Sequence, residues 1–435
     1  MQSKNYIKDI IVIGFALFAM FFGSGNVLFP PYLGVTTGSG WFIGVMSYMI
    51  ADIFIAMLAI VVMVKSDGNL TAVTGRTGKI PALLINLAVI ICIGPLFCIP
   101  RSSAATFDMI LVPLFNAKNG TVTSVIFSIV FFLIVYLLTV RPNKVCDIIG
   151  KFLTPLLLAS LALVIIKGII SPIGPVVDVG GVAKVIESGV IAGYQSMDVF
   201  GALNLGLVVI ATASTKGYKD KKDAISVISF ASIVCLICLF VVSLGLAYLG
   251  GTVSTLYNAD VSQATLVFLI TKHLYGSAGG ILIGFLTGLA CFTTAVGLTS
   301  GTSSYFQRLT GNKISYERGV LYCCVVSCII ANFGLSKIIA LAVPTLTLIF
   351  PVVVVLIVLS LFTNKIKKDS VFIGAASATF LANVLTMLST TYNMNIPVVK
   401  YMPLFDLGFG WVLPALFACI IGMVWPIKST EKSSQ

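Results

Sequence analysis

Charged side chains and histidine are scarce in this sequence of 435 residues. Asp, Glu, Lys and Arg make up 10% of the chain, whereas a soluble domain carries about a quarter. His273 is the single histidine, which excludes most histidine-based metal and catalytic clusters. A G-x-x-x-x-G-K-[ST] loop is also missing, so ATP-driven pumping within this chain is excluded. We therefore expect no enzyme activity, no catalytic residues and no cofactor.

Ten cysteines give no metal or disulfide framework. Nearly all lie in apolar runs, where thiols pack as small hydrophobic groups. Cys235 and Cys238 form a C-x-x-C pair, but it lies within a helical run and has no second ligand pair, so no zinc site is predicted.

Long apolar runs dominate what is present. Hydrophobic residues make up 58% of the chain and the mean hydropathy is +1.08. Runs of about 18 or more apolar residues can cross roughly 30 Å of hydrocarbon as a helix, and the weak two-residue alternation of a spanning barrel is missing. The sequence predicts an all-α, polytopic membrane protein with twelve transmembrane helices, near residues 9–34, 41–64, 80–112, 121–140, 147–169, 192–213, 223–249, 278–307, 319–334, 337–362, 370–391 and 404–427.

The net charge of +12 comes from basic residues in the short loops between these segments, which favours membrane topology over nucleic-acid binding. When the N-terminus is placed in the cytoplasm, 20 of the 27 Lys and Arg residues fall inside. Both termini are then expected in the cytoplasm. The first apolar run is too long for a signal peptide, and residues 171–191 are expected to form an outer loop with a short interfacial helix.

Two of the predicted helices contain weak points at equivalent places. The first holds Gly23, Ser24, Gly25 and Asn26 at its middle, where glycines and polar side chains weaken a helix. The sixth holds Gln195, Ser196, Met197 and Asp198. Paired interruptions in corresponding helices are typical of inverted-repeat transporters with a binding site at the midplane. We predict that both helices break there.

The ends of broken helices define the expected chemistry. A half-helix starting near Gly25 would present free N–H groups to a carboxylate. Free carbonyls at Ala19, Phe22 and residues 195–198 would suit an ammonium group or a hard cation. No Arg or Lys is expected to face this region, so a zwitterion with an apolar tail is the predicted substrate.

Hydroxyl groups and two carboxylates complete the candidate site. Thr293 and Thr294 lie near the middle of the eighth segment and could provide oxygen ligands for sodium, although such hydroxyls often bond to the backbone one turn back. Asp52 and Asp198 lie at membrane depth, where an ionised group needs a partner, water or a proton. Each is an alternative proton site, and Asp52 could instead be a structural acid.

At these residues the sequence resembles the branched-chain amino acid–cation symporters of the BrnQ type (the LIVCS family). The motifs that carry the resemblance are GFALFAMFFGSGNVLFPP (14–31), GYQSMDVFGALNLG (193–206), CFTTAVGLTSGTSSYF (291–306) and VPTLTLIFPVVVVLIVL (343–359). The resemblance extends over essentially the whole chain.

This resemblance implies a LeuT-like fold: a 5+5 inverted repeat with broken helices 1 and 6, plus two peripheral helices. The first repeat would cover residues 1–170 and the second 192–362, on either side of the 171–191 loop. Residues 363–435 would hold the last two helices and a cytoplasmic tail. Leucine, isoleucine and valine would be the substrates, in a bacterial plasma membrane.

The resemblance also assigns roles to residues. Gly23, Ser24, Gly25 and Asn26 would bind substrate at the first break, and Gln195, Ser196, Met197 and Asp198 at the second. The coupling ion, Na⁺ with H⁺ as the alternative, would bind at Ala19, Phe22, Ala290, Thr293 and Thr294, the first three through carbonyl oxygens.

Alternative functions remain open from the residues alone. A symporter of another small neutral solute would need the same broken helices. An ion channel would normally show a filter loop or a ring of subunits, and neither is evident. Membrane lipids are the expected surroundings, and no obligatory protein partner or nucleic acid is predicted.

Overall fold

The computed structural model describes residues 6–115, 121–140, 145–178, 181–257, 260–363, 365–391, 394 and 396–424. The expected tail after Ile427 lies outside these residues. The described part is almost entirely helical, with one isolated β-bridge between Gly38 and Asp178. Its α-helices are α1 (Tyr6–Phe21), α2 (Ser24–Thr37), α3 (Trp41–Tyr48), α4 (Phe54–Lys65), α5 (Leu70–Thr74), α6 (Lys79–Ile91), α7 (Cys98–Phe115), α8 (Thr121–Val140), α9 (Val145–Ile170), α10 (Val182–Ser196), α11 (Asp198–Thr215), α12 (Lys221–Thr252), α13 (Gln263–Leu309), α14 (Tyr316–Ala331), α15 (Leu335–Leu361), α16 (Asp369–Thr390), α17 (Pro397–Lys400) and α18 (Val412–Val424).

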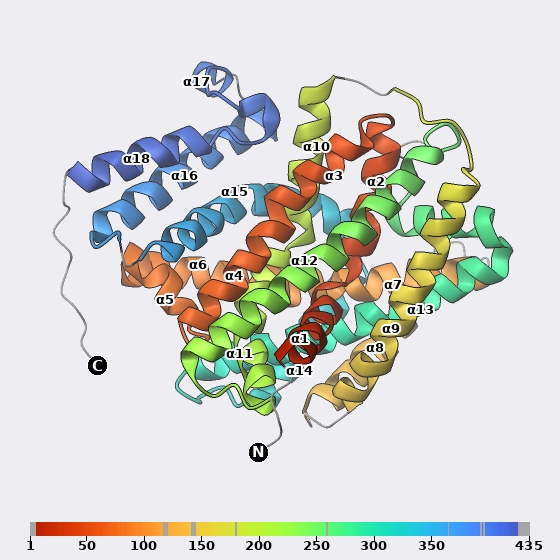
Figure 1. Cartoon of the computed structure of the whole chain (residues 1–435), viewed down its shortest axis with the longest axis horizontal. Helices are drawn as coiled ribbons and strands as arrows, with labels where there is room; N and C mark the ends of the chain where they lie inside the picture. The colour runs from red at the N-terminus through yellow and green to blue at the C-terminus, as the bar shows by residue number, and fades with distance from the viewer. Residues whose placement is uncertain are drawn as a thin grey trace.

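Each of the twelve predicted segments corresponds to a helix or to a broken or kinked run of helices (Figure 1). Within the described residues, eight helical runs are long and apolar enough to cross a membrane, and the α1–α2 pair makes a ninth. The remaining three segments correspond to α9, α14 and α18. The all-α, multi-pass architecture predicted from the apolar runs is therefore confirmed.

Two helices begin earlier than the sequence predicts. α10 starts at Val182 and runs without interruption toward the second break, inside the segment expected to be an outer loop with an interfacial helix. α13 starts at Gln263 and contains a kink at Gly276, whose φ of 71° suits glycine. In both cases the helix begins with a stretch that contains polar residues, and the apolar pattern therefore predicts a later start. The residue bounds of the two repeats, 1–170 and 192–362, stay a prediction.

Two short π-helical turns interrupt the second and third segments. η1 (Met49–Ile53) joins α3 to α4, and η3 (Cys92–Leu96) joins α6 to α7. The second contains Gly94 in a non-helical conformation, followed by Pro95, which has no N–H to donate. Such π-turns are frequent at functional positions, and these two place Asp52 and Arg101 respectively.

The first segment is broken as predicted. α1 and α2 meet at an angle of 73°, and Gly23 between them is extended, with φ −116° and ψ −158°. α2 packs closely on α12, because Gly34 faces Ala247 and Gly250 faces Pro31 so tightly that a Cβ atom at either glycine would overlap the opposite backbone. Small residues allow this close approach of membrane helices. The packing fixes the direction of the second half-helix.

The last helices lie at one edge of the molecule. α16 and α18 run side by side there, with α15 next to α16 (Figure 1). An ion pair joins this group to the rest of the chain: Arg76 Nε lies 2.6 Å from Asp369 Oδ1, and the Arg76 guanidinium also covers the Phe372 ring. This peripheral position agrees with the predicted role of the final two spans.

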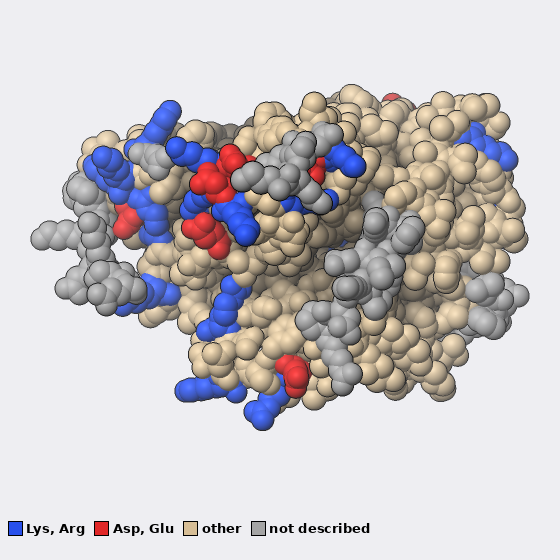
Figure 2. Space-filling model, turned by 60° about the horizontal axis from the view of Figure 1, so that its bottom comes forward, with Lys and Arg blue, Asp and Glu red and all other residues tan. Residues whose placement is uncertain are grey.

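The start of α1 is attached to the loop before α12. Tyr218 Oη donates a hydrogen bond to Asp9 at 3.0 Å. Burial, with help from the Asp9 carboxylate, raises the pKa of Tyr218 to about 12, so the phenol keeps the proton that it donates. In Figure 2 many of the charged side chains gather on the left of the face shown, whereas most of the surface to the right carries uncharged residues.

Candidate functional site

Asn26 joins the two predicted breaks directly. It lies in the first turn of α2, and its Nδ2 donates to Asp198 Oδ2 at 2.7 Å and to the Phe21 carbonyl at 2.9 Å. Asp198 is the first residue of α11, and Phe21 is the last residue of α1. One amide group therefore bonds both to the carbonyl that ends α1 at the first break and to a carboxylate at the second.

The second break is a single residue, Met197. Its backbone is left-handed, with φ 66° and ψ 23°, which is uncommon for any residue other than glycine. Strained positions of this kind persist where the surrounding structure holds them and cluster at functional sites. Met197 is fully buried between α10 and α11. The sixth segment is thus broken where the sequence predicts.

Tyr48 adds a further connection between the breaks. Its hydroxyl lies 3.0 Å from Asn26 Oδ1 and 3.2 Å from Ser196 Oγ. The ring is completely buried at the end of α3. Sequence reasoning missed this residue, because a tyrosine within an apolar run carries no sign of its partners.

Asp52 caps the second half-helix. It lies in the π-turn η1, fully buried, and accepts hydrogen bonds from the backbone N–H groups of Asp198 at 3.3 Å and Val199 at 3.1 Å. These are among the free donors at the start of α11, and a carboxylate there also suits the positive end of the helix dipole. The geometry supports a structural role for this acid, one of the two roles that the sequence leaves open.

Arg101 lies in the site, which contradicts the expectation that no Arg or Lys faces it. It is 2% exposed on α7. Its Nε donates to Ser24 Oγ at 3.1 Å, Nη1 to the Gln195 carbonyl at 2.5 Å and Nη2 to the Ser196 carbonyl at 3.2 Å.

With the N-terminus in the cytoplasm, Arg101 is one of the seven basic residues not counted inside, which are expected outside the membrane or near the outer ends of the predicted helices. The structure shows why this was wrong: η3 precedes α7, and Arg101 lies in the first turn of that helix, many residues before its end. One signal in the sequence could have revealed the buried position. Arg101 lies well before the end of the 80–112 apolar run, too far for its side chain to reach the membrane surface.

Two glycines keep the first break open. A Cβ atom at Gly25 would lie 2.6 Å from Ser196 Oγ and 3.2 Å from Arg101 Nη2. A Cβ atom at Gly23 would lie 3.0 Å from Thr294 Oγ1. Any side chain at Gly25 would therefore enter the space between α2, α10 and Arg101.

A small cavity lies at this junction. Its volume is about 20 Å³, enough for roughly one water molecule, so binding of a larger solute requires the walls to separate. The lining comes from both breaks, from α7 and from α13, and includes Phe21, Gly25, Arg101, Ser196, Asp198 and Thr294. Gln195 also belongs to this region, and its Oε1 is buried without a hydrogen-bond partner among the described residues.

The candidate cation residues are partly brought together. Thr294 faces Gly23, and its buried hydroxyl has no hydrogen-bond partner within the described part of the chain. Thr293 instead donates to the Ala290 carbonyl at 2.9 Å, the backbone bond typical of membrane helices. Ala19 lies in the last turn of α1 and Phe22 lies in the break itself, buried and stacked on Phe18.

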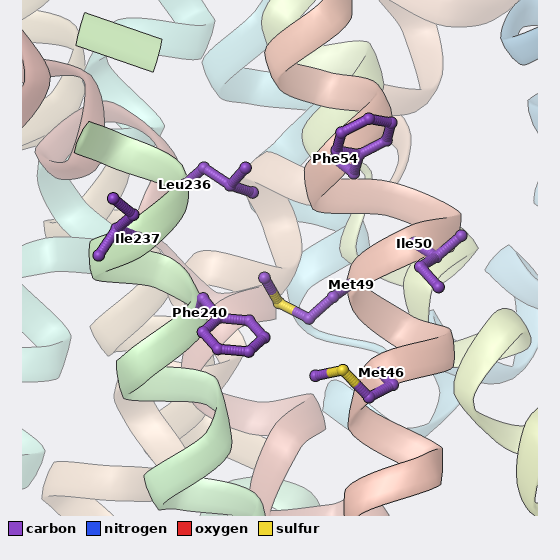
Figure 3. A pocket seen from close by; sticks show the side chains of 7 residues that line it. All are labelled: Met46, Met49, Ile50, Phe54, Leu236, Ile237 and Phe240. Atoms are coloured by element: carbon purple, nitrogen blue, oxygen red, sulfur yellow. The ribbon is translucent and has the colours of Figure 1, made fainter. Parts of the chain in front are cut away.

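A larger apolar groove lies apart from this site. Its volume is about 330 Å³, and it runs between the α3–η1–α4 segment and α12. Figure 3 shows Met49, Leu236 and Phe240 pointing toward one another between the two helices. Ile50 and Ile237 at its rim are more than half exposed. A groove without polar groups on the membrane-facing surface suits hydrocarbon rather than a zwitterion.

The fold is shared with a transporter of known structure. Mhp1, a nucleobase-cation-symport-1 family transporter solved in a closed conformation with bromovinylhydantoin bound, superposes with a TM-score of 0.61 and 12% sequence identity, covering 97% of this chain and 94% of Mhp1. Its inward-facing structure gives the same TM-score, with 14% identity over 96% of this chain and 90% of that one. The predicted LeuT-like transporter fold is confirmed.

Sequence comparison defines the family. Residues 6–429 match the family described as branched-chain amino acid transport protein. The permease BraB of Bacillus subtilis is 31% identical over 98% of this chain and 97% of its own length. The permease BrnQ of Salmonella typhimurium is 29% identical over 96% and 95%. The chain belongs to the branched-chain amino acid transport protein family, whose named members here are permeases and not enzymes.

Proposed function

We propose that this protein takes up leucine, isoleucine and valine across a bacterial plasma membrane, driven by a cation gradient and by alternating access. Family membership supports the substrate class. The observation that carries the mechanism is the meeting of two helix breaks around Asn26 and Asp198, beside a cavity that contains Arg101.

The arrangement suits a zwitterion. The first turn of α2 offers backbone N–H groups next to Gly25, and the end of α10 offers the Gln195 and Ser196 carbonyls. A substrate carboxylate fits the positive side and an ammonium group the negative side. Gly23, Ser24, Gly25 and Asn26 would hold the carboxylate end, and residues 195–198 the amine and side chain.

The fixed charges favour a coupled cation. Asp52 and Asp198 are two buried carboxylates, and Arg101 is one buried cation. A zwitterion brings no net charge, so a bound cation would balance the second carboxylate. We favour Na⁺ at Thr294, where a buried hydroxyl faces the unwound backbone at Gly23, with Ala19, Phe22, Ala290 and Thr293 as neighbours. A proton on Asp198 or Asp52 is the alternative.

Uptake into proteoliposomes tests this function. Labelled leucine should accumulate above its equilibrium level when a Na⁺ gradient is imposed at constant pH. Accumulation driven only by a pH gradient would assign the coupling to protons. Equilibration without accumulation under either gradient would contradict coupled transport and favour a channel.

A further inference from the structure

Arg101 is the one arginine in the described part of the chain that lies deep in the interior next to both breaks. Its three guanidinium nitrogens all donate hydrogen bonds, to Ser24 at the first break and to the Gln195 and Ser196 carbonyls at the second. A buried charge is costly unless it is paired and hydrogen-bonded. The position of this guanidinium therefore needs a reason beyond packing.

The partners of Arg101 are polar but carry no full negative charge. Among the described residues no carboxylate lies within ion-pair distance of it. The two nearby carboxylates are engaged elsewhere: Asp198 accepts from Asn26, and Asp52 accepts from the backbone at the start of α11. The guanidinium is held by the negative end of the α10 dipole, and none of the described carboxylates forms an ion pair with it.

Arg101 also forms part of the cavity wall on the side that faces Gly25. Its Nη2 lies 3.2 Å from the position that a Cβ atom at Gly25 would occupy. A carboxylate placed at the first turn of α2 would therefore lie within reach of both the backbone N–H groups and the guanidinium. Arginine is the residue best suited to such a contact, because its planar fork binds a carboxylate through two parallel hydrogen bonds.

We propose that Arg101 selects the substrate by its carboxylate, through an exchange of partners. The substrate enters between Arg101 and the end of α10. Arg101 then gives up its hydrogen bonds to the Gln195 and Ser196 carbonyls and binds the substrate carboxylate. The substrate ammonium group donates hydrogen bonds to the two carbonyls instead. Each hydrogen bond that is broken is replaced by a charge-assisted one, and the cavity opens because α7 and the end of α10 separate. This role rests on the proposed function and adds the residue that recognises the acid group.

The alternative is that Arg101 only holds the end of α10 in place. Both roles predict that its loss harms transport, so uptake alone does not separate them. A ligand that differs from leucine only at the carboxylate does. Leucinamide keeps the side chain and the amine but carries no negative charge.

The experiment measures the affinities of purified full-length protein for leucine and for leucinamide by ligand-dependent thermal stabilisation, a readout that follows binding directly. The wild type should favour leucine by at least about 30-fold, the effect of losing one partner of a buried charge pair. In Arg101→Gln this preference should fall to a few-fold, and in Arg101→Lys it should be intermediate, since an ammonium group lacks the fork. Arg76→Gln, which removes an arginine paired with Asp369 away from the site, should keep the wild-type preference.

If Arg101→Gln weakened the affinities for leucine and leucinamide equally, so that their ratio stayed unchanged, the proposal would be overturned and Arg101 would be a structural residue. If the glutamine variant does not fold, an unchanged ratio in Arg101→Lys has the same meaning. Failure of the wild type to bind leucine at all would instead refute the proposed function, so the two failures are distinguishable.

Discussion

Asn26 Nδ2 and Asp198 Oδ2 lie 2.7 Å apart although 172 positions separate the two residues in the sequence. Each belongs to the first turn of a half-helix that follows a break, α2 for Asn26 and α11 for Asp198. The contact makes the two breaks parts of one site. Because Tyr48 and the Phe21 carbonyl bond to the same Asn26 amide, its removal would take one hydrogen bond from each of three buried groups, the Asp198 carboxylate among them.

Asn26→Ala should therefore lower both stability and uptake. An unsatisfied buried group costs about 1–3 kcal/mol, so we expect a lower unfolding temperature in detergent and little leucine accumulation. Combining it with Asp198→Ala in a double-mutant cycle should show coupling, because the two residues share a hydrogen bond. Ser226→Ala, at an exposed contact with Tyr6, is the control. Additive effects of the two substitutions would argue against the shared network.

Asp52→Asn should retain uptake driven by a Na⁺ gradient. Asparagine keeps one oxygen to accept from the start of α11, whereas Asp52→Ala removes the cap and should cost about 1 kcal/mol or more of stability. Leucine accumulation and unfolding temperature are measured for both variants. If Asp52→Asn abolished accumulation without loss of stability, Asp52 would be a proton site and not a cap.

Gly25→Leu should abolish leucine uptake while the protein still inserts into the membrane. Even a Cβ atom at Gly25 would crowd Ser196 Oγ at 2.6 Å, and the larger side chain would fill the place proposed for the carboxylate. Gly181→Leu is a matched control, because nothing lies within 4 Å of a Cβ atom there. Membrane content is measured by immunoblot. Normal uptake by the Gly25 variant would refute the assignment of this space to the substrate.

Thr294→Ala should raise the Na⁺ concentration needed for half-maximal uptake more than Thr293→Ala does. The Thr294 hydroxyl is unpartnered among the described residues, whereas Thr293 already donates to Ala290. The double variant should show the largest shift. Thr212→Ala, an exposed threonine bonded to its own helix, should show none. An unchanged Na⁺ dependence in the double variant would favour proton coupling.

Both helix breaks could be predicted from the sequence, but the residue at which the second break occurs could not. Gly23 and Gly25 signal the first break, because glycine weakens a helix wherever it occurs. The second break was expected from Gln195, Ser196 and Asp198, yet the residue that turns the chain is Met197, whose left-handed backbone no propensity favours. Local chemistry predicted the place, and tertiary packing selected the residue.

Arg101 and Asp52 show the limit of that approach. Charge counting assigned Arg101 to a loop end, because the sequence does not reveal that η3 and the packing of α7 bring it next to α10. Asp52 could be recognised as a buried acid, but its partners are backbone N–H groups of another segment. The hydrogen-bond partners of Arg101 and of Asp52 lie far from these residues in the sequence, so the neighbouring residues do not predict them.

The sequence by itself determined the class of this protein: apolar runs long enough to cross a bilayer, the number of segments and the two weak points, all properties of neighbouring residues. Only the tertiary structure decided that a buried arginine and a capping aspartate complete the site, and that α10 begins before its expected start. The reason is that hydrogen bonds between distant segments depend on how the helices pack, and packing leaves no local pattern in the chain.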